Sequence, residues 1–142
     1  MGRPNPIRRF RLLGGWILAR HRGGPMGITL HDERVISLRD DLLRVEYDGT
    51  LLHEVIHAER GPTLDNLVER EELAVRRGTA QQLLPDVVAI GEALAWAQRR
   101  VSDAADELDV DVDVLWDRID NLTLAELRYI EARLDRVWSP SA

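Results

Sequence analysis

The residues best suited to chemistry lie in one short stretch, His53-Glu54-Val55-Ile56-His57, which has the pattern HEXXH. In a helix, residues four apart lie on the same face, so His53 and His57 can offer two imidazole nitrogens to one metal ion. Glu54 lies about 100° around the helix from His53, where its carboxylate can hold a water at the metal and accept its proton. Zinc is the expected metal, because imidazole suits it and catalytic zinc keeps a position open for water.

The residues around this motif predict a helix with one apolar side and one polar side. When they are placed at steps of about 100°, the apolar residues gather on one broad arc and the two histidines lie opposite. The apolar residues are Leu51, Leu52, Val55, Ile56 and Ala58. A histidine that only filled a core would lie within that arc. We therefore expect a helix over 49–60, with its back in a core and its front lining a cleft.

The composition limits the class of protein. A chain of 142 residues, 44% of them hydrophobic, is long enough for one domain, or one domain with a small appendage. Cysteine is absent, which excludes disulfides, zinc ligation by cysteine and a cysteine nucleophile. The net charge of −6 argues against general affinity for nucleic acid, because phosphates must be met by a basic surface.

The start of the chain is basic and contains a short apolar run, which raises the question of a signal peptide. The run is split by Gly14 and Gly15, and Arg20 follows where a cleavage site with small residues should lie. No stretch approaches the length of a transmembrane span. We therefore expect a cytoplasmic protein with no membrane partner.

The remaining patterns predict an α+β fold, in which a small antiparallel sheet of two or three strands packs on a mainly helical domain with a C-terminal helical bundle. Asp32-Glu33-Arg34 predicts a hairpin turn between two of the strands, and Asp48-Gly49 predicts a break before the HEXXH helix. Thr63 and Thr123 are expected to cap helices. The expected strands are 16–21, 27–30 and 35–38, and the other expected helices are 63–84, 86–100, 103–108, 112–120 and 124–137.

Three segments are expected along the chain. Residues 1–15 form a basic N-terminal segment, residues 16–100 the core around the HEXXH motif, and residues 101–142 an acidic helical segment packed on that core. The last segment begins with two short helices around a turn, which is the outline of a helix-turn-helix. A second helix that reads DNA needs basic residues, and the one over 112–120 has three aspartates against Arg118. Direct binding of nucleic acid is therefore not expected, and the acids are interpreted as a solvated face or as a surface that steers a basic partner.

A catalytic zinc site usually has three protein ligands and one open position, so two histidines do not complete it. Without cysteine, the candidates for the third ligand are His21, His31 and the carboxylates. Glu71 and Glu72 flank an apolar stripe on the next expected helix, where a charged residue needs a partner. The residues of this stripe are Leu64, Leu67, Val68 and Val75. A tight turn at Gly61-Pro62 would bring that helix back towards the histidines, but the helical phase leaves both glutamates open.

Two motifs together resemble the ImmA/IrrE family of zinc metallopeptidases. The stretch from Thr50 to Ala58 is similar to the active-site helix of that family. The stretch from Glu72 to Pro85 is similar to its second motif, in which a glutamate and an apolar Leu-Leu-Pro-like end lie on one helix. The expected hairpin over 27–38 also fits, and the likeness covers about residues 16–100.

This resemblance implies a gluzincin-like site for Zn²⁺, with Glu72 as the third ligand and Glu71 as the fallback, and with Glu54 as the catalytic base. Members of known role cleave helix-turn-helix repressors of phages, mobile elements or stress regulons. The expected function is therefore a zinc endopeptidase whose partner is a protein substrate, a DNA-binding repressor. Two alternatives stay open: a regulatory protein that binds a metal without catalysis, which would add a fourth protein ligand, and a toxin-like metallohydrolase.

Overall fold

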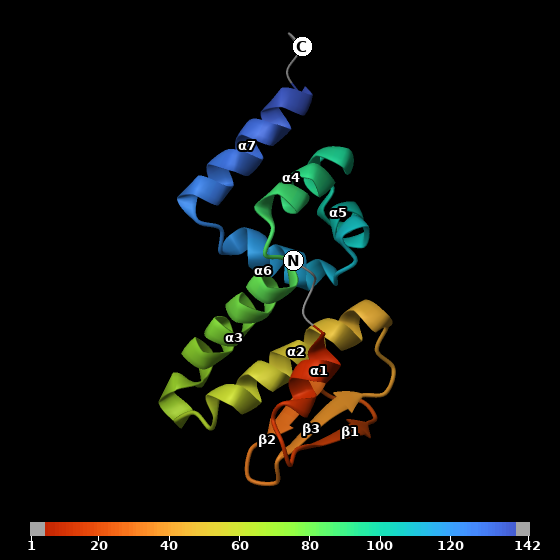
Figure 1. The fold of residues 1–142 in the computed structure, drawn as a ribbon, viewed down its shortest axis with the longest axis vertical. Helices are drawn as coiled ribbons and strands as arrows, with labels where there is room; N and C mark the ends of the chain where they lie inside the picture. Colours follow the sequence, from red (N-terminus) through yellow and green to blue (C-terminus); the bar gives the residue numbers. More distant parts are fainter. Residues whose placement is uncertain (1–4, 139–142) are drawn as a thin grey trace. The chain divides into compact units, whose positions relative to one another are not determined.

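The HEXXH stretch lies within a long helix, α2 (Arg44–Arg60), which crosses a small sheet (Figure 1). The computed structural model describes residues 5–138, and the side chains among them up to residue 136. Residues 1–4 of the expected N-terminal segment lie outside the described residues. The other elements are α1 (Pro6–Arg11), β1 (Ile17–His21), β2 (Gly27–Leu30), β3 (Val35–Arg39), η1 (Asp65–Leu67), α3 (Val68–Leu83), α4 (Val87–Trp96), α5 (Val101–Leu108), α6 (Val112–Asp120) and α7 (Leu124–Trp138).

The chain forms two compact units, Met1–Thr79 and Ala80–Ala142, which are called here the N-terminal and C-terminal units. Their boundary lies within α3, whereas the sequence placed a change of segment near residue 100. Helix α4 contacts α5 and α7, all of them in the C-terminal unit. The expected α+β class is confirmed. None of the helices within residues 5–138 combines the length and the apolar character that a membrane span requires.

The sheet is mixed, so the expectation of an antiparallel sheet is wrong in part. Its strand order is β1-β3-β2. Strand β2 pairs with β3 in the expected antiparallel hairpin, but β1 pairs with β3 in parallel. The reason is that residues 22–26 lead the chain past the place that β3 later fills, so β3 enters between two strands that run in opposite directions.

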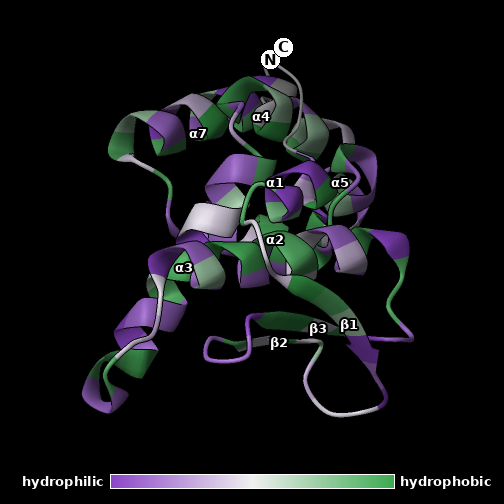
Figure 2. Cartoon of the chain, turned by 60° about the horizontal axis from the view of Figure 1, so that its bottom comes forward, coloured by the Kyte–Doolittle hydropathy of each residue, from purple (hydrophilic) through white to green (hydrophobic). Residues whose placement is uncertain are grey.

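The core of the N-terminal unit joins the central strand to the back of α2 (Figure 2). Ile36 and Leu38 of β3 pack with Leu51 and Val55 of α2, and each of these side chains is at most 1% exposed. Residues two apart on a strand and four apart on a helix share a face, which brings these pairs together. The expected position of the helix, with its apolar arc in a core, is therefore confirmed.

Helix α2 starts earlier than the sequence indicated, and the break expected at Asp48-Gly49 is wrong. The helix begins at Arg44, where the Glu46 carboxylate accepts a hydrogen bond of 2.9 Å from the Leu43 backbone N–H. That bond satisfies one of the free N–H groups near a helix start. Gly49 is buried within the helix, so packing outweighs its weak helix propensity.

The C-terminal unit contains the expected pair of short helices around a turn, α5 and α6. Helix α4 ends at Trp96, before the expected end at residue 100. Gln98 and Arg99 adopt positive φ angles of 54° and 67°, which are incompatible with a right-handed helix. Asp109 takes the left-handed conformation at the end of α5.

The cap expected at Thr123 is confirmed, since its hydroxyl accepts a hydrogen bond of 3.1 Å from the Glu126 backbone N–H. The cap expected at Thr63 is wrong, because Leu64 occupies that position before η1.

Arg118 is the basic residue that a DNA-reading helix could have used, but it is buried in the C-terminal unit, at 2% exposure. Its guanidinium donates 2.7 Å hydrogen bonds to the Leu84 carbonyl and to the Glu126 carboxylate. The hydrogen bond from Arg118, together with the Thr123 backbone N–H, lowers the pKa of Glu126 to about 2. Arg118 therefore links α6 to Leu84, which directly follows α3, and to the start of α7.

Replacing Arg118 with methionine is expected to lower the free energy of unfolding by about 3 kcal/mol, because the Glu126 carboxylate and the Leu84 carbonyl lose their buried donor. Urea denaturation of the full chain, followed by circular dichroism, measures this change. The matched control is Arg100→Met, since Arg100 pairs with Asp103 on the surface, at 62% and 45% exposure. That variant should lose about 0.5 kcal/mol or less. Equal losses in the two variants would show that Arg118 is no more important than a surface residue.

Candidate metal centre

Helix α2 and the part of α3 that belongs to the N-terminal unit bring the candidate ligands together. Helix α2 carries His53 and His57 one turn apart and ends at Gly61, where φ is 86° and the backbone N–H donates to the His57 carbonyl at 3.0 Å. Glycine adopts this positive φ without the strain that a side chain would bring. The chain then turns through Pro62, and α3 carries Glu72 back to the histidines.

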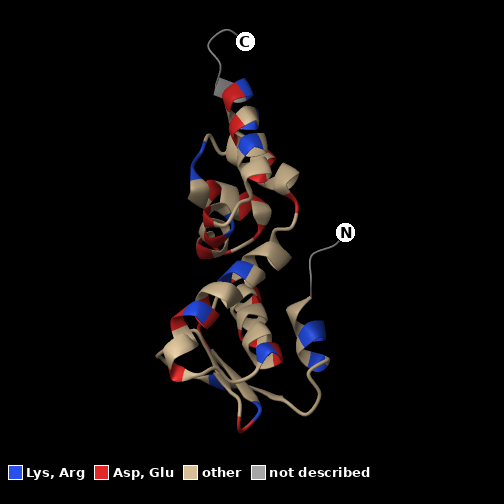
Figure 3. Cartoon of the chain, turned by 90° about the vertical axis from the view of Figure 1, so that its left-hand side faces the viewer, with Lys and Arg blue, Asp and Glu red and all other residues tan. Residues whose placement is uncertain are grey.

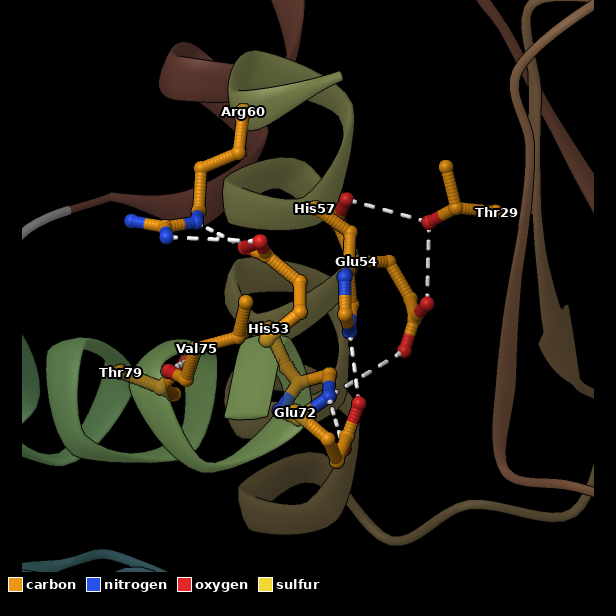
Figure 4. Close-up of polar contacts among 9 residues, drawn as sticks. Thr29, His53, Glu54, His57, Arg60, Glu72, Val75 and Thr79 are labelled. Carbon is orange, nitrogen blue, oxygen red and sulfur yellow. Dashed lines mark hydrogen bonds and ion pairs between the residues drawn. The ribbon is translucent and has the colours of Figure 1, made fainter. Parts of the chain in front are cut away.

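The ligand atoms of His53, His57 and Glu72 all lie within 4.8 Å of one another, so these three residues could hold a metal ion (Figure 4). The Glu72 carboxylate spans both imidazoles: Oε1 lies 2.8 Å from His53 Nε2 and Oε2 lies 2.8 Å from His57 Nε2. The histidine side chains are 19% exposed and Glu72 is 46% exposed. The cluster thus lies on a helix whose apolar side is buried, and it is open to solvent on one side.

The donor set fits a cation that accepts both nitrogen and oxygen. Two imidazole nitrogens and one carboxylate oxygen are a combination that Zn²⁺ takes in catalytic sites with three protein ligands. The ring centroids of His53 and His57 are 4.9 Å apart, and both Nε2 atoms are directed at the same carboxylate. The convergence that a metal requires is therefore present in the positions of the side chains.

Glu54 lies beside this cluster and is buried, at 7% exposure. Its Oε2 is 4.0 Å from His53 Nε2, and its Oε1 accepts a hydrogen bond of 2.9 Å from the Thr29 hydroxyl (Figure 4). A buried carboxylate needs such a partner, because burial without a hydrogen bond is costly. One oxygen of the Glu54 carboxylate is thus held by Thr29, and the other is directed at the cluster.

Glu71, the fallback for the third ligand, is turned to a different partner. It forms an ion pair with Arg60 at the end of α2. The hydrogen bond from the Arg60 guanidinium lowers the pKa of the Glu71 carboxyl. The structure thus brings Glu72 to the histidines and places Glu71 on the neighbouring arginine.

The other two histidines, His21 and His31, contact residues of the sheet and its loops. Both ring nitrogens of His21 have partners at 2.7 Å, the Ser37 hydroxyl and the Pro25 carbonyl. His31 lies edge-on to Trp16, with ring centroids 6.3 Å apart. Neither belongs to the group formed by His53, His57 and Glu72.

The sequence did not single out Gly27 and Thr29 of β2. Thr29 donates a hydrogen bond to Glu54, and a Cβ at position 27 would clash with Glu54. A signal was available, because a glycine and a threonine two apart on an expected strand share one face. The strand was expected, but nothing in the sequence says that this face meets the HEXXH helix.

Comparison of the chain with protein-family models, with curated proteins and with solved structures gives no match. The resemblance to the ImmA/IrrE family therefore stays a prediction.

Proposed function

We propose that this protein is a zinc-dependent endopeptidase. The observation that supports this best is the convergence of His53, His57 and Glu72 within 4.8 Å, with the buried Glu54 carboxylate beside them. Metallopeptidases with an HEXXH helix use this combination of two histidines, a third ligand and an adjacent glutamate base. The three-residue group fits a catalytic site better than a structural one, in which four protein ligands are usual.

His53, His57 and Glu72 would hold Zn²⁺, which supplies Lewis-acid polarisation of a peptide carbonyl and makes water more acidic. Glu54 accepts the proton of the attacking water and then donates it to the nitrogen of the leaving amine. Its burial and its hydrogen bond from Thr29 keep the carboxylate in one place for both transfers.

We further propose that the substrate is a DNA-binding repressor of the helix-turn-helix type. The support is the resemblance of the two motifs to the ImmA/IrrE family and the charge of the C-terminal unit. Acidic residues are frequent on α5 and α6 (Figure 3). Arg118 of α6 is buried in an ion pair with Glu126 of α7. An acidic surface favours the approach of a basic protein.

Incubation of the purified full chain with a proteome-derived peptide library, followed by mass spectrometry, tests the proposal. We expect internal peptide bonds to be cleaved, the cleavage to stop after treatment with a chelator, and Zn²⁺ to restore it. Loss of at least about 100-fold in rate is expected on metal removal, because both the bound water and the carbonyl lose their activation. Cleavage that continues at the same rate in the chelated protein would contradict a metallopeptidase.

A further inference from the structure

Strand β2 faces the candidate site with two residues, Gly27 and Thr29. They are two apart, so the alternation of the strand places both on one face, and that face meets Glu54 on α2. We propose that Gly27 and Thr29 form a cradle that positions the Glu54 carboxylate, with Thr29 as a positioning residue. This inference rests on the proposed peptidase function, in which Glu54 carries the proton.

Thr29 makes the two oxygens of the Glu54 carboxylate different. The Thr29 hydroxyl lies 2.9 Å from Glu54 Oε1 and 3.2 Å from the Glu54 backbone carbonyl, so it contacts the residue at both ends. Hydrogen bonds to a charged acceptor are among the stronger ones in proteins. Oε1 is therefore hydrogen-bonded to β2, and Oε2 lies on the side of His53, whose Nε2 is 4.0 Å away.

Gly27 leaves the space that this carboxylate fills. A Cβ at position 27 would lie 2.8 Å from Glu54 Cγ, 3.0 Å from Glu54 Oε2 and 2.7 Å from Thr50 Cγ2. The Thr50 side chain is β-branched and has few rotamers to escape into. Any side chain at position 27 would therefore push Glu54 out of its position, which gives this glycine a role that does not depend on backbone freedom.

The kinetic test compares Thr29→Val, which keeps the shape and removes the hydroxyl, with Thr29→Ser, which keeps the hydroxyl. On a peptide that the wild-type protein cleaves, Thr29→Val should lower kcat by about 10- to 100-fold, as for other residues that orient a group at a metal site. KM and the zinc content should not change, and Thr29→Ser should retain most of the rate. The matched control is Thr79→Val in α3, which loses a buried hydrogen bond to the Val75 carbonyl and should leave kcat unchanged.

Crystal structures of the zinc-free wild type, Thr29→Val and Gly27→Ala give a readout that does not depend on activity. We expect the Glu54 carboxylate in one position in the wild type and displaced from it in both variants. The cradle is wrong if Glu54 keeps its position in both variants, or if Thr29→Val retains the kcat of the wild type.

The two proposals fail in different ways. If the wild type cleaves no peptide, the peptidase function is wrong, and the structures still decide whether β2 fixes Glu54. If the wild type cleaves and the variants cleave equally well, the function stands and the positioning role is wrong.

Discussion

Replacing Glu54 with glutamine is expected to lower the rate of peptide cleavage by about 10²- to 10⁴-fold while the protein still binds zinc. The amide has the shape of the carboxylate and can still accept the hydrogen bond from Thr29 on its oxygen. It cannot take a proton from water, so the proton transfers that we assign to Glu54 are lost. Steady-state kinetics on a cleaved peptide, together with the metal content by mass spectrometry, measure both effects.

Glu59→Gln is the matched control for this variant. Glu59 lies on the same helix, and its carboxylate accepts a 2.9 Å hydrogen bond from the Arg9 guanidinium of α1, away from the histidine cluster. The same chemical change there should leave the rate of cleavage unaltered. Cleavage by Glu54→Gln at the rate of the control would show that another group accepts the proton, and the proposed mechanism would then be wrong.

The HEXXH helix and its orientation followed from the sequence because both depend on local pattern. Residues four apart share a helix face whatever the rest of the fold does, and the apolar arc that includes Leu51 and Val55 needs a core. The hairpin of β2 and β3 is also local and was expected. The parallel pairing of β1 with β3 was not, because strand order depends on the path of the chain between strands.

The choice between Glu71 and Glu72 could not be made from the helical phase. The apolar stripe predicted for their helix is wrong in part, because three of its four residues, Leu64, Leu67 and Val68, are exposed and only Val75 is buried. The turn after α2 decides between the two glutamates, because it sets the rotation of α3 about its own axis. In the resulting orientation Glu71 pairs with Arg60. Contacts between distant segments, such as that of Thr29 with Glu54, lie beyond local pattern for the same reason.

The second large effect concerns the metal itself. His53→Ala is expected to abolish stoichiometric zinc binding, because the variant keeps one imidazole and one carboxylate where a stable site needs three protein ligands. His31→Ala is the matched control, since His31 packs edge-on against Trp16 and does not belong to the ligand cluster. That variant should keep its zinc, and with it the rate of cleavage.

The zinc content of the purified wild type, His53→Ala and His31→Ala tests the central claim most directly. After incubation with Zn²⁺ and removal of the excess, the wild type and His31→Ala should each hold about one zinc per chain, and His53→Ala should hold almost none. Equal zinc in all three proteins, or none in the wild type, would contradict a metal centre built on His53, His57 and Glu72.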